Sequence, residues 1–292
     1  MFTLADAYLA EDIVDIINHG YLDENPRPKY EDGTPAHTYS VNHNVRRYDL
    51  SRGEFPICSL RPVAWKTSIK EIFTIYQKPT NVISEMEELG VAWWKPWDIG
   101  NGTIGQRYGA TVKRYNLIEN LINDIQKNPY GRRKVVDLWQ ETDLHETDGL
   151  SPCAFCTIWN VRGEFLDMML VQRSGDMLTA SGGGQANEIQ YAALLMMIAR
   201  HTGYKAGVFT HVVANEQIYD RHIDAAKELL SRAQVEREKL MGIVQNNPDS
   251  VIAMPMLVLN PEKNNFYDFT IDDFTLENYE PIKPNLKLEL GI

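Results

Sequence analysis

One cysteine of this chain stands in a setting that suits nucleophilic chemistry. Cys153 follows a proline in the segment LSPCAFC, with polar residues on one side and apolar residues on the other. A nucleophilic cysteine needs access to its substrate and a lowered thiol pKa, which nearby cations supply. Arg132, Arg133 and Arg173 are cations that would serve if the fold brings them close to the thiol.

Other interpretations of this cysteine stay open at the level of the residues. A free cysteine on a strand is often a small core residue. The CxxC spacing of Cys153 and Cys156 also fits a redox pair, although no β-α-β pattern accompanies it. Zinc is poorly supported, because no second Cys/His pair of suitable spacing follows.

Arginines next to turns and strand ends indicate an anion site. Arg132 and Arg133 directly follow the turn Asn-Pro-Tyr-Gly, and Arg173 and Ser174 end an apolar strand. Guanidinium groups bind a phosphate dianion through paired hydrogen bonds and keep their charge. On an acidic protein, this set predicts a pocket for a small phosphorylated ligand. The alternative for Arg132 and Arg133 is a pair of exposed salt bridges.

Two further segments are candidates for ligand contacts. SGGGQ at 181–185 lacks the Lys-Ser/Thr of a P-loop and the spacing of a dinucleotide fingerprint, so a flexible turn is the better interpretation. Trp93, Trp94 and Trp97 lie in a polar loop, where they either stack on a planar ring or join the core.

Composition limits the kind of protein that must position these side chains. The 292 residues are 43% hydrophobic, and their formal net charge of -11 disfavours nucleic acid and anionic membranes as partners. No run of about 18 apolar residues would span a membrane. The three cysteines and the acidic N-terminal segment, which is unlike a secretory signal, indicate a reducing compartment. We therefore expect a cytoplasmic enzyme or binding protein.

Hydrophobic periodicity predicts the elements that carry these residues. Helices are predicted at 4–19, 65–76, 115–127, 187–201 and 220–238, and strands at 39–48, 134–139, 154–161, 165–173 and 209–219. Segments 26–38 and 93–109 are predicted loops, and short strands are predicted from about 249 onward. Strands and helices without strict alternation predict an α+β fold, built as one domain over 1–292.

The ordered motifs of the chain resemble those of one enzyme family. From Asp23 to Ile292 the chain contains, in order, GTPAHT, SIKEIF with Glu71, WWKPWDIGNGTIGQRYG, NPYGRRKVV, LSPC, QRSGD, Asn187 four residues before Tyr191, QIYDRH and FYDFTIDDF. This series resembles thymidylate synthase. The resemblance implies a three-layer α+β fold, in which a large mixed β-sheet packs against its twin in a homodimer. It also implies reductive methylation of dUMP to dTMP with 5,10-methylenetetrahydrofolate as carbon and hydride donor, and no metal.

The same resemblance implies a role for each matching residue. Cys153 would be the nucleophile that adds to C6 of the pyrimidine, Glu71 would organise proton transfer around O4, and Tyr108 would help to remove the C5 proton. Asp176 and Arg173 complete the implied catalytic set. The implied nucleotide contacts are Arg27, Arg173, Ser174, Gly175, Asp176, Asn187, Gln217 and Tyr219, with Arg132 and Arg133 reaching over from the partner subunit. The implied folate contacts are Trp94, Trp97, Leu150, Asp176 and Gly291.

Departures from the family pattern keep a second activity open. The stretch at 177–187 is longer than the family's Leu-Gly-x-Pro-Phe-Asn, and Gln217 stands in place of a histidine. The alternative is a pyrimidine nucleotide 5-hydroxymethylase acting on dUMP or CMP/dCMP, in which water takes the place of hydride. Asn187 argues against the cytidine version, where an aspartate is expected. A non-catalytic nucleotide- or RNA-binding homologue would leave Cys153 and Glu71 unexplained.

Overall fold

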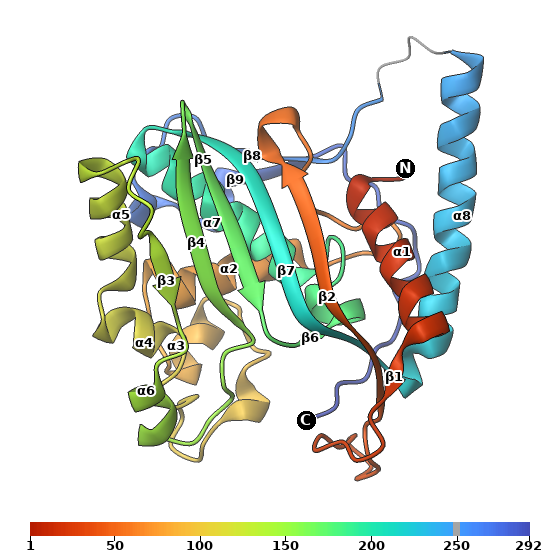
Figure 1. The fold of residues 1–292 in the computed structure, drawn as a ribbon, viewed down its shortest axis with the longest axis horizontal. Helices are drawn as coiled ribbons and strands as arrows, with labels where there is room; N and C mark the ends of the chain where they lie inside the picture. Colours follow the sequence, from red (N-terminus) through yellow and green to blue (C-terminus); the bar gives the residue numbers. More distant parts are fainter. Residues whose placement is uncertain (248–251) are drawn as a thin grey trace.

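The computed structural model describes residues 1–247 and 252–292, and a mixed β-sheet forms its centre (Figure 1). Within these residues the sheet has seven strands in the order β1-β2-β7-β5-β4-β3, with β6 paired to β7. The strands are β1 (Tyr21–Leu22), β2 (Thr38–Asp49), β3 (Val135–Asp137), β4 (Ala154–Arg162), β5 (Phe165–Gln172), β6 (Gly175–Asp176) and β7 (Lys205–Tyr219). A separate two-stranded sheet joins β8 (Met256–Leu259) to β9 (Phe274–Glu277).

Helices surround this sheet on one face and at both of its edges (Figure 1). They are α1 (Leu4–His19), α2 (Trp65–Ile72), α3 (Ile83–Glu88), α4 (Gly109–Arg114), α5 (Leu117–Lys127), α6 (Glu141–Glu146), α7 (Ala186–Thr202) and α8 (Ile223–Asn246). Single π turns cover Phe73–Gln77 and Met177–Ser181. Short 3-10 turns cover Leu50–Arg52, Lys95–Trp97, Asp220–His222, Phe266–Asp268 and Ile271–Asp273. In the described part of the chain, none of the helices combines the length and the apolar character that crossing a membrane requires.

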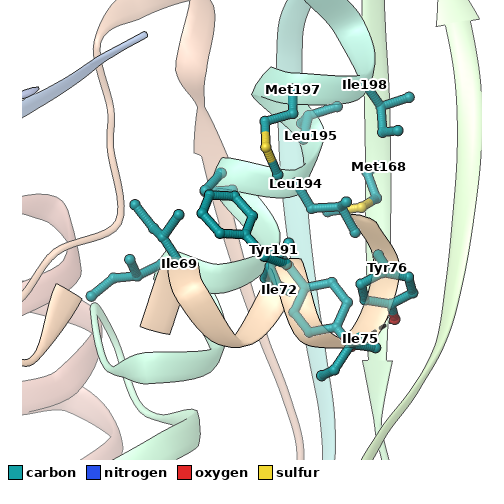
Figure 2. Close-up of a cluster of buried hydrophobic side chains, with 14 of the residues drawn as sticks. Ile69, Ile72, Ile75, Tyr76, Met168, Tyr191, Leu194, Leu195, Met197 and Ile198 are labelled. Carbon is teal, nitrogen blue, oxygen red and sulfur yellow. Dashed lines mark hydrogen bonds between the residues drawn. The ribbon is translucent and has the colours of Figure 1, made fainter. Parts of the chain in front are cut away.

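The main core lies between the sheet and helices α2 and α7 (Figure 2). Helix α7 is apolar around most of its circumference, as expected for a helix buried between two layers. Its side chains pack against α2 and against the inner face of β5. The packed side chains include Ile69, Ile72, Tyr76, Met168, Tyr191, Leu194, Leu195 and Ile198. This core fixes the ends of α2, β5 and α7 relative to one another.

The strand connections bring distant parts of the sequence to one edge of the sheet. Strands β4 and β5 form an antiparallel hairpin in which Ala154 is paired with Gln172. Strands β5 and β7 are parallel and are joined through α7, as in a β-α-β unit. The residue before β4, the residue after β5 and the first turn of α7 therefore lie near one another.

The sheet face that points away from α2 and α7 carries exposed apolar side chains. Val45, Val135 and Met169 are 58%, 50% and 39% exposed, while Tyr48, Val136 and Met168 on the same strands are buried. Because side chains alternate between the two faces of a strand, the three exposed residues share one face. An exposed apolar face of this kind is typical of an interaction surface.

Most predicted elements are present, with a few differences. The predicted helix at 65–76 ends at Ile72 and continues as a π turn, in which Lys78 N donates to Phe73 O at 2.8 Å. The six-residue helices α3, α4 and α6 were not predicted, because they are too short for a helical period to emerge. The predicted tail begins at residues 249–251, which lie outside the described residues, and short strands follow as predicted.

The glycine-rich stretch at 181–185 forms a turn that is packed in the interior. Gly184 has a φ of +70°, and a Cβ there would lie 2.1 Å from the backbone nitrogen of Cys58. The Gly184 N–H donates to Oε2 of Glu188 at 2.7 Å, and Cys58 N donates to Gly184 O at 3.0 Å. The prediction of a turn is therefore confirmed, but this turn is held from several sides and is not free in solvent.

Candidate active site

Cys153 and Arg173 lie side by side where β4 begins and β5 ends. Nη2 of Arg173 is 3.5 Å from Sγ of Cys153, and the backbone N–H of Arg173 donates to Cys153 O at 2.9 Å. The same guanidinium donates to Pro152 O at 3.0 Å and to Ser151 O at 2.8 Å. It also lies over the ring of Trp139, 5.7 Å from the ring centre. The structure thus holds a permanent cation next to the thiol.

The charge balance at this thiol differs from the one expected from the sequence. Burial raises the pKa of Cys153, and the charges of Arg173 and Arg27 only partly oppose that shift. The expected lowered pKa is therefore wrong for this chain without its ligands. Arg132 and Arg133 are exposed on the turn before β3, so the arginines that act on the thiol within one chain are Arg173 and Arg27.

Glu71 is buried on α2 among three hydrogen-bond donors. Oε1 accepts from Nε1 of Trp93 at 2.8 Å and also from Nε1 of Trp94. Oε2 accepts from Nε2 of Gln190. Burial raises the pKa of Glu71 to about 7, against the lowering effect of these donors. A carboxyl group with this pKa exchanges its proton readily at neutral pH, which suits acid-base work.

Tyr108 connects this carboxyl group to the nucleophile. Its hydroxyl oxygen accepts a hydrogen bond from the backbone N–H of Cys153 at 3.2 Å, and its ring meets Trp94 edge to face at 4.8 Å. Its φ is +48°, a conformation that is uncommon for residues other than glycine. Burial raises the pKa of Tyr108 well above its usual value, so the hydroxyl keeps its proton and can donate it.

The side-chain amide of Asn187 is held on both sides in the first turn of α7. Its Oδ1 accepts from Nε2 of Gln172 at 3.1 Å, and its Nδ2 donates to Oε1 of Gln190 at 2.9 Å. Because Gln190 also donates to Glu71, a continuous series of hydrogen bonds joins Asn187 to the buried carboxyl group. The polar atoms of this amide therefore have one defined orientation.

The residues just after β5 lie beside the same edge of the sheet. Ser174 O accepts from Nε2 of Gln172 at 3.0 Å. Gly175 is buried, and a Cβ there would lie 2.1 Å from Oγ of Ser181. Asp176 accepts from Leu178 N at 3.3 Å and from the Thr179 hydroxyl, and burial raises its pKa.

The loop that contains Arg27 approaches the end of β7 and the C-terminal residues. Arg27 is exposed, and its charge acts on both Cys153 and Tyr219. The hydroxyl of Tyr219 donates to Gly291 O at 3.5 Å, and burial raises the pKa of Tyr219 to about 12. Gln217, two residues earlier on β7, lines a surface pocket of about 540 Å³ together with Thr38, Ser40 and Asn215.

The residues predicted to contact the second ligand lie around the aromatic loop. Trp94 is buried, and its ring meets the half-buried Trp97 edge to face at 5.7 Å. Leu150 is half-buried and packs against the main core. Of these three side chains, only Trp94 also bonds to Glu71.

Several contacts of this constellation were not predicted from the sequence. Gln190 and Gln172 hold Asn187, Trp93 donates to Glu71, and Trp139 lies under Arg173. For two of these residues, Gln190 and Gln172, the sequence contains a pattern that could have indicated the contact. Gln190 is three residues after Asn187 and thus on the same helix face, and Gln172 is a polar residue at an inward position of an apolar strand.

The arrangement combines a thiol beside a cation, a titratable carboxyl group and an oriented amide. Such a set can add a nucleophile to a planar ring, stabilise the charge that develops and move protons. Among the described residues, no group of three or more His, Cys, Asp and Glu side chains is placed to hold a metal ion.

Comparison with known proteins gives one consistent result. A family model described as "Thymidylate synthase" matches residues 7–292. The chain is 46% identical to thymidylate synthase from Lactococcus lactis subsp. cremoris over 297 residues, covering 99% of this chain and all of the relative. It is 42% identical to thymidylate synthase from Streptococcus sanguinis, with the same coverage. The fold matches the solved structure titled thermostable thymidylate synthase A from Bacillus subtilis with a TM-score of 0.84, at 34% identity and 99% coverage of both chains.

Proposed function

The chain belongs to the thymidylate synthase family and is a methyltransferase that converts dUMP to dTMP, and from this premise we propose how its residues divide the reaction. The family uses 5,10-methylenetetrahydrofolate as co-substrate, which supplies the carbon and the hydride. One observation carries the assignment of residues. The thiol of Cys153, the guanidinium of Arg173 and the amide of Asn187 converge at one edge of the sheet, next to the buried carboxyl group of Glu71.

Cys153 is the nucleophile in this proposal. Its sulfur forms a bond to C6 of the pyrimidine, and the C5–C6 electron pair moves toward C4 and O4. Carbon C5 of the resulting enolate then attacks the one-carbon unit of the folate. Arg173, whose Nη2 lies 3.5 Å from Sγ, stabilises the thiolate that must form first.

Glu71 and Tyr108 handle protons in this scheme. Glu71 carries a pKa of about 7, so it can take and return a proton near O4 as charge develops there. Tyr108 lies against the backbone of Cys153, and because its hydroxyl keeps its own proton, it helps to remove the C5 proton by orienting a solvent water that accepts it. Loss of this proton and of tetrahydrofolate leaves a methylene group on C5. Hydride from the tetrahydrofolate then completes the methyl group and leaves dihydrofolate, while the Cys153 thiolate departs from C6 and the C5–C6 double bond is restored.

Binding of dUMP depends on charge and on the amide. We assign the phosphate to Arg27, Arg173 and Ser174, together with Arg132 and Arg133 of a partner subunit. The exposure of Arg132 and Arg133 supports this assignment, because neither side chain has a hydrogen bond or an ion pair among the described residues. Asn187 forms hydrogen bonds to the base. Gly175 and Asp176, at the strand end beside Asn187, also contact the nucleotide. Gln217 and Tyr219 contact the sugar.

The partner subunit is a second copy of this chain in our proposal. The exposed apolar face with Val45, Val135 and Met169 supports it, since two such faces bury each other in a two-fold dimer. We also propose that residues 1–292 act as one catalytic domain in the cytoplasm. The family match over 7–292 and the three free cysteines support this.

The folate is assigned to Trp94, Trp97, Leu150, Asp176 and Gly291. Half-buried apolar side chains and a carboxyl group with a raised pKa are suited to a planar heterocycle with ring N–H groups. Trp97 and Leu150 supply the apolar contacts, and Asp176 bonds to the ring. The C-terminal residues close over the ligands and keep water out.

The test is to incubate the protein with dUMP and 5,10-methylenetetrahydrofolate and to identify both products by mass spectrometry. We expect methylated nucleotide and dihydrofolate in equal amounts. Hydroxymethylated nucleotide with tetrahydrofolate would instead support the 5-hydroxymethylase alternative. The C153S variant is the matched control, and product formation by that variant at the wild-type rate would overturn the assignment of the nucleophile.

A further inference from the structure

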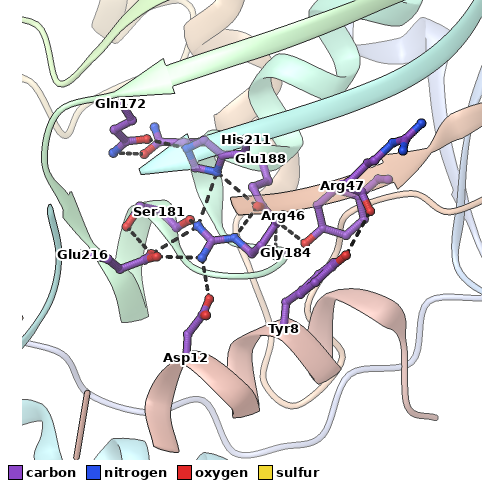
Figure 3. Close-up of polar contacts among 12 residues, drawn as sticks. Tyr8, Asp12, Arg46, Arg47, Gln172, Ser181, Gly184, Glu188, His211 and Glu216 are labelled. Carbon is purple, nitrogen blue, oxygen red and sulfur yellow. Dashed lines mark hydrogen bonds and ion pairs between the residues drawn. The ribbon is translucent and has the colours of Figure 1, made fainter. Parts of the chain in front are cut away.

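A cluster of buried charges reaches Gln172, the residue that holds Asn187 (Figure 3). Arg46, on β2, is 1% exposed and donates from Nε to Oε1 of Glu188 at 2.7 Å and from Nη1 to Oε2 of Glu216 at 2.7 Å. Nη1 also donates to Oδ2 of Asp12 at 2.5 Å, and Nη2 donates to Ser181 O. The cluster therefore joins α1, β2, the glycine-rich turn, α7 and β7.

His211 is the member of this cluster that faces the site. Its Nδ1 lies 3.1 Å from Oε1 of Glu188 and 3.4 Å from Nη2 of Arg46, and its Nε2 lies 3.0 Å from Oε1 of Gln172 (Figure 3). The imidazole is fully buried, so Arg46 and Glu188 fix the plane of the ring.

The direction of the hydrogen bond between His211 and Gln172 follows from the partners of Gln172. Nε2 of Gln172 donates to the carbonyl oxygen of Ser174, which can only accept, and to Oδ1 of Asn187. Oε1 of Gln172 must therefore face His211, and Nε2 of His211 must carry a proton in either charge state of the ring. His211 is a donor at this position.

The amide of Asn187 is thus at the end of a directed series that begins in the buried cluster. An amide oxygen has two lone pairs and an amide nitrogen has two hydrogens. Gln172 occupies one lone pair of Asn187, and Gln190 occupies one hydrogen. The remaining lone pair of Asn187 can accept from N3–H of uracil, and its remaining hydrogen can be donated to O4. Cytosine instead has an acceptor at N3 and a donor at N4, so it does not match these two atoms of Asn187.

We propose that His211, fixed by the ion cluster around Arg46, is a positioning residue that sets the preference for uracil over cytosine by holding Gln172 and, through it, the amide of Asn187. This inference rests on the proposed role of Asn187 in the reaction. His211 touches neither substrate nor folate in this scheme. Its effect is on which base is accepted.

The test compares base preference in three variants. H211F keeps a planar ring, which can stack on Phe209 as His211 does with ring centres 6.2 Å apart, but it removes the donor. H211Q returns an amide donor. Y48F removes the hydrogen bond from the Tyr48 hydroxyl to Oε2 of Glu188, which disturbs the same cluster on the side away from Gln172. The measurement is kcat/KM for dUMP divided by kcat/KM for dCMP.

We expect the ratio to fall about tenfold in H211F, to recover to within about threefold in H211Q and to stay at the wild-type value in Y48F. Thermal unfolding separates stability from preference, because H211F and Y48F should both unfold at lower temperature. An unchanged ratio in a folded H211F protein overturns the proposal. An equal fall of the ratio in Y48F also overturns the proposal, since any disturbance of the buried ion cluster would then explain the change in base preference.

Nitrogen NMR of the imidazole rings tests the same proposal without depending on the folding of a variant. In the wild-type protein, Nε2 of His211 should give the signal of a protonated nitrogen, and an unprotonated Nε2 overturns the proposal. The proposed function is tested separately by dTMP formation in the wild-type protein. If the wild type makes dTMP and N187D changes base preference while H211F does not, only the role of His211 fails.

Discussion

The guanidinium of Arg173 is tied to the two carbonyl groups that precede Cys153 and, at the same time, lies 3.5 Å from Sγ of that cysteine. Its position is therefore set by the backbone at the start of β4, and the thiol itself need not attract it. A cation held in this way is preorganised to stabilise a thiolate, because it does not have to move when the charge appears. Burial still raises the pKa of the thiol, so substrate binding must complete the activation.

Replacing Arg173 by glutamine should make the thiol less reactive. Arg173 opposes the effect of burial on the pKa of Cys153, so its loss should raise this pKa further and slow alkylation by iodoacetamide at pH 8 about fivefold. Peptide mass spectrometry resolves Cys153 from Cys156 and Cys58. R162Q removes the same charge from an exposed site on β4 and should leave the rate unchanged. Equal rates in R173Q and wild type would contradict the assignment.

Replacing Cys153 by serine should separate binding from chemistry. We expect turnover to fall by at least about a thousandfold, because the nucleophile is lost. Binding of dUMP, measured by calorimetry, should change less than about threefold, since the arginines and the Asn187 amide remain. Strongly weakened binding would show that Cys153 contributes mainly to the shape of the site.

Activity should depend on the protonation of Glu71. Both of its oxygens accept hydrogen bonds from donors, and these donors serve the carboxylate form of Glu71. With a pKa raised by burial to about 7, kcat/KM should fall as the pH drops below 7. The pH-rate profile checks this, and in E71Q the remaining slow activity should lack that limb. If kcat/KM of E71Q falls below pH 7 as it does in wild type, the group that titrates is not Glu71.

The same carboxyl group should make the protein less stable as the pH rises. Its folded-state pKa of about 7 lies above the reference value of 4.5, so the folded state binds the proton more tightly. Stability should therefore fall between pH 4.5 and 7, by up to about 3 kcal/mol. Urea unfolding at pH 5 and pH 8 should show a clearly larger fall in wild type and in the exposed-site control E238Q than in E71Q, where Asp12 and Asp176, whose pKa values burial also raises, still contribute.

Sharing of arginines between subunits should be visible as complementation. A C153S subunit lacks the nucleophile, and a subunit with R132Q and R133Q lacks the arginines that we assign to its partner. Either homodimer should be nearly inactive, whereas a mixture refolded together should regain about a quarter of wild-type activity, because half of the dimers then contain one complete site. If the mixture stays inactive, Arg132 and Arg133 do not serve the neighbouring subunit.

The packed glycine turn predicts a large cost for an added methyl group. In G184A the Cβ would lie 2.1 Å from Cys58 N, at a φ of +70°, and we expect a loss of about 3 kcal/mol of unfolding free energy. Gly163 has a φ of +60° but open space around it, so G163A should lose only about 1 kcal/mol. Equal losses measured in urea would show that backbone strain alone explains the cost.

Sequence periodicity predicted the elements better than it predicted the contacts within the site. The length of its apolar run located α7, and alternation located β4 and β5, because both patterns report which side chains are buried. The same patterns carry no information about hydrogen-bond partners. The meeting of Trp93 with Glu71 joins segments 22 residues apart in the chain, through a loop whose shape only the folded protein determines. The resemblance to a family supplied the roles of the matching positions, and it did not point to Gln172 or His211.

The pairing of β7 with both β2 and β5 has a consequence for synthesis on the ribosome. Strand β2 is complete at Asp49, and β5 at Gln172, but the strand that lies between them begins only at Lys205. Until that segment leaves the exit tunnel, β2 and β5 each have one edge whose backbone N–H and C=O groups lack the partners that β7 later provides. During this interval the growing chain exposes edges on which other chains can pair, so chaperones that shield such edges should matter most for this protein before β7 emerges.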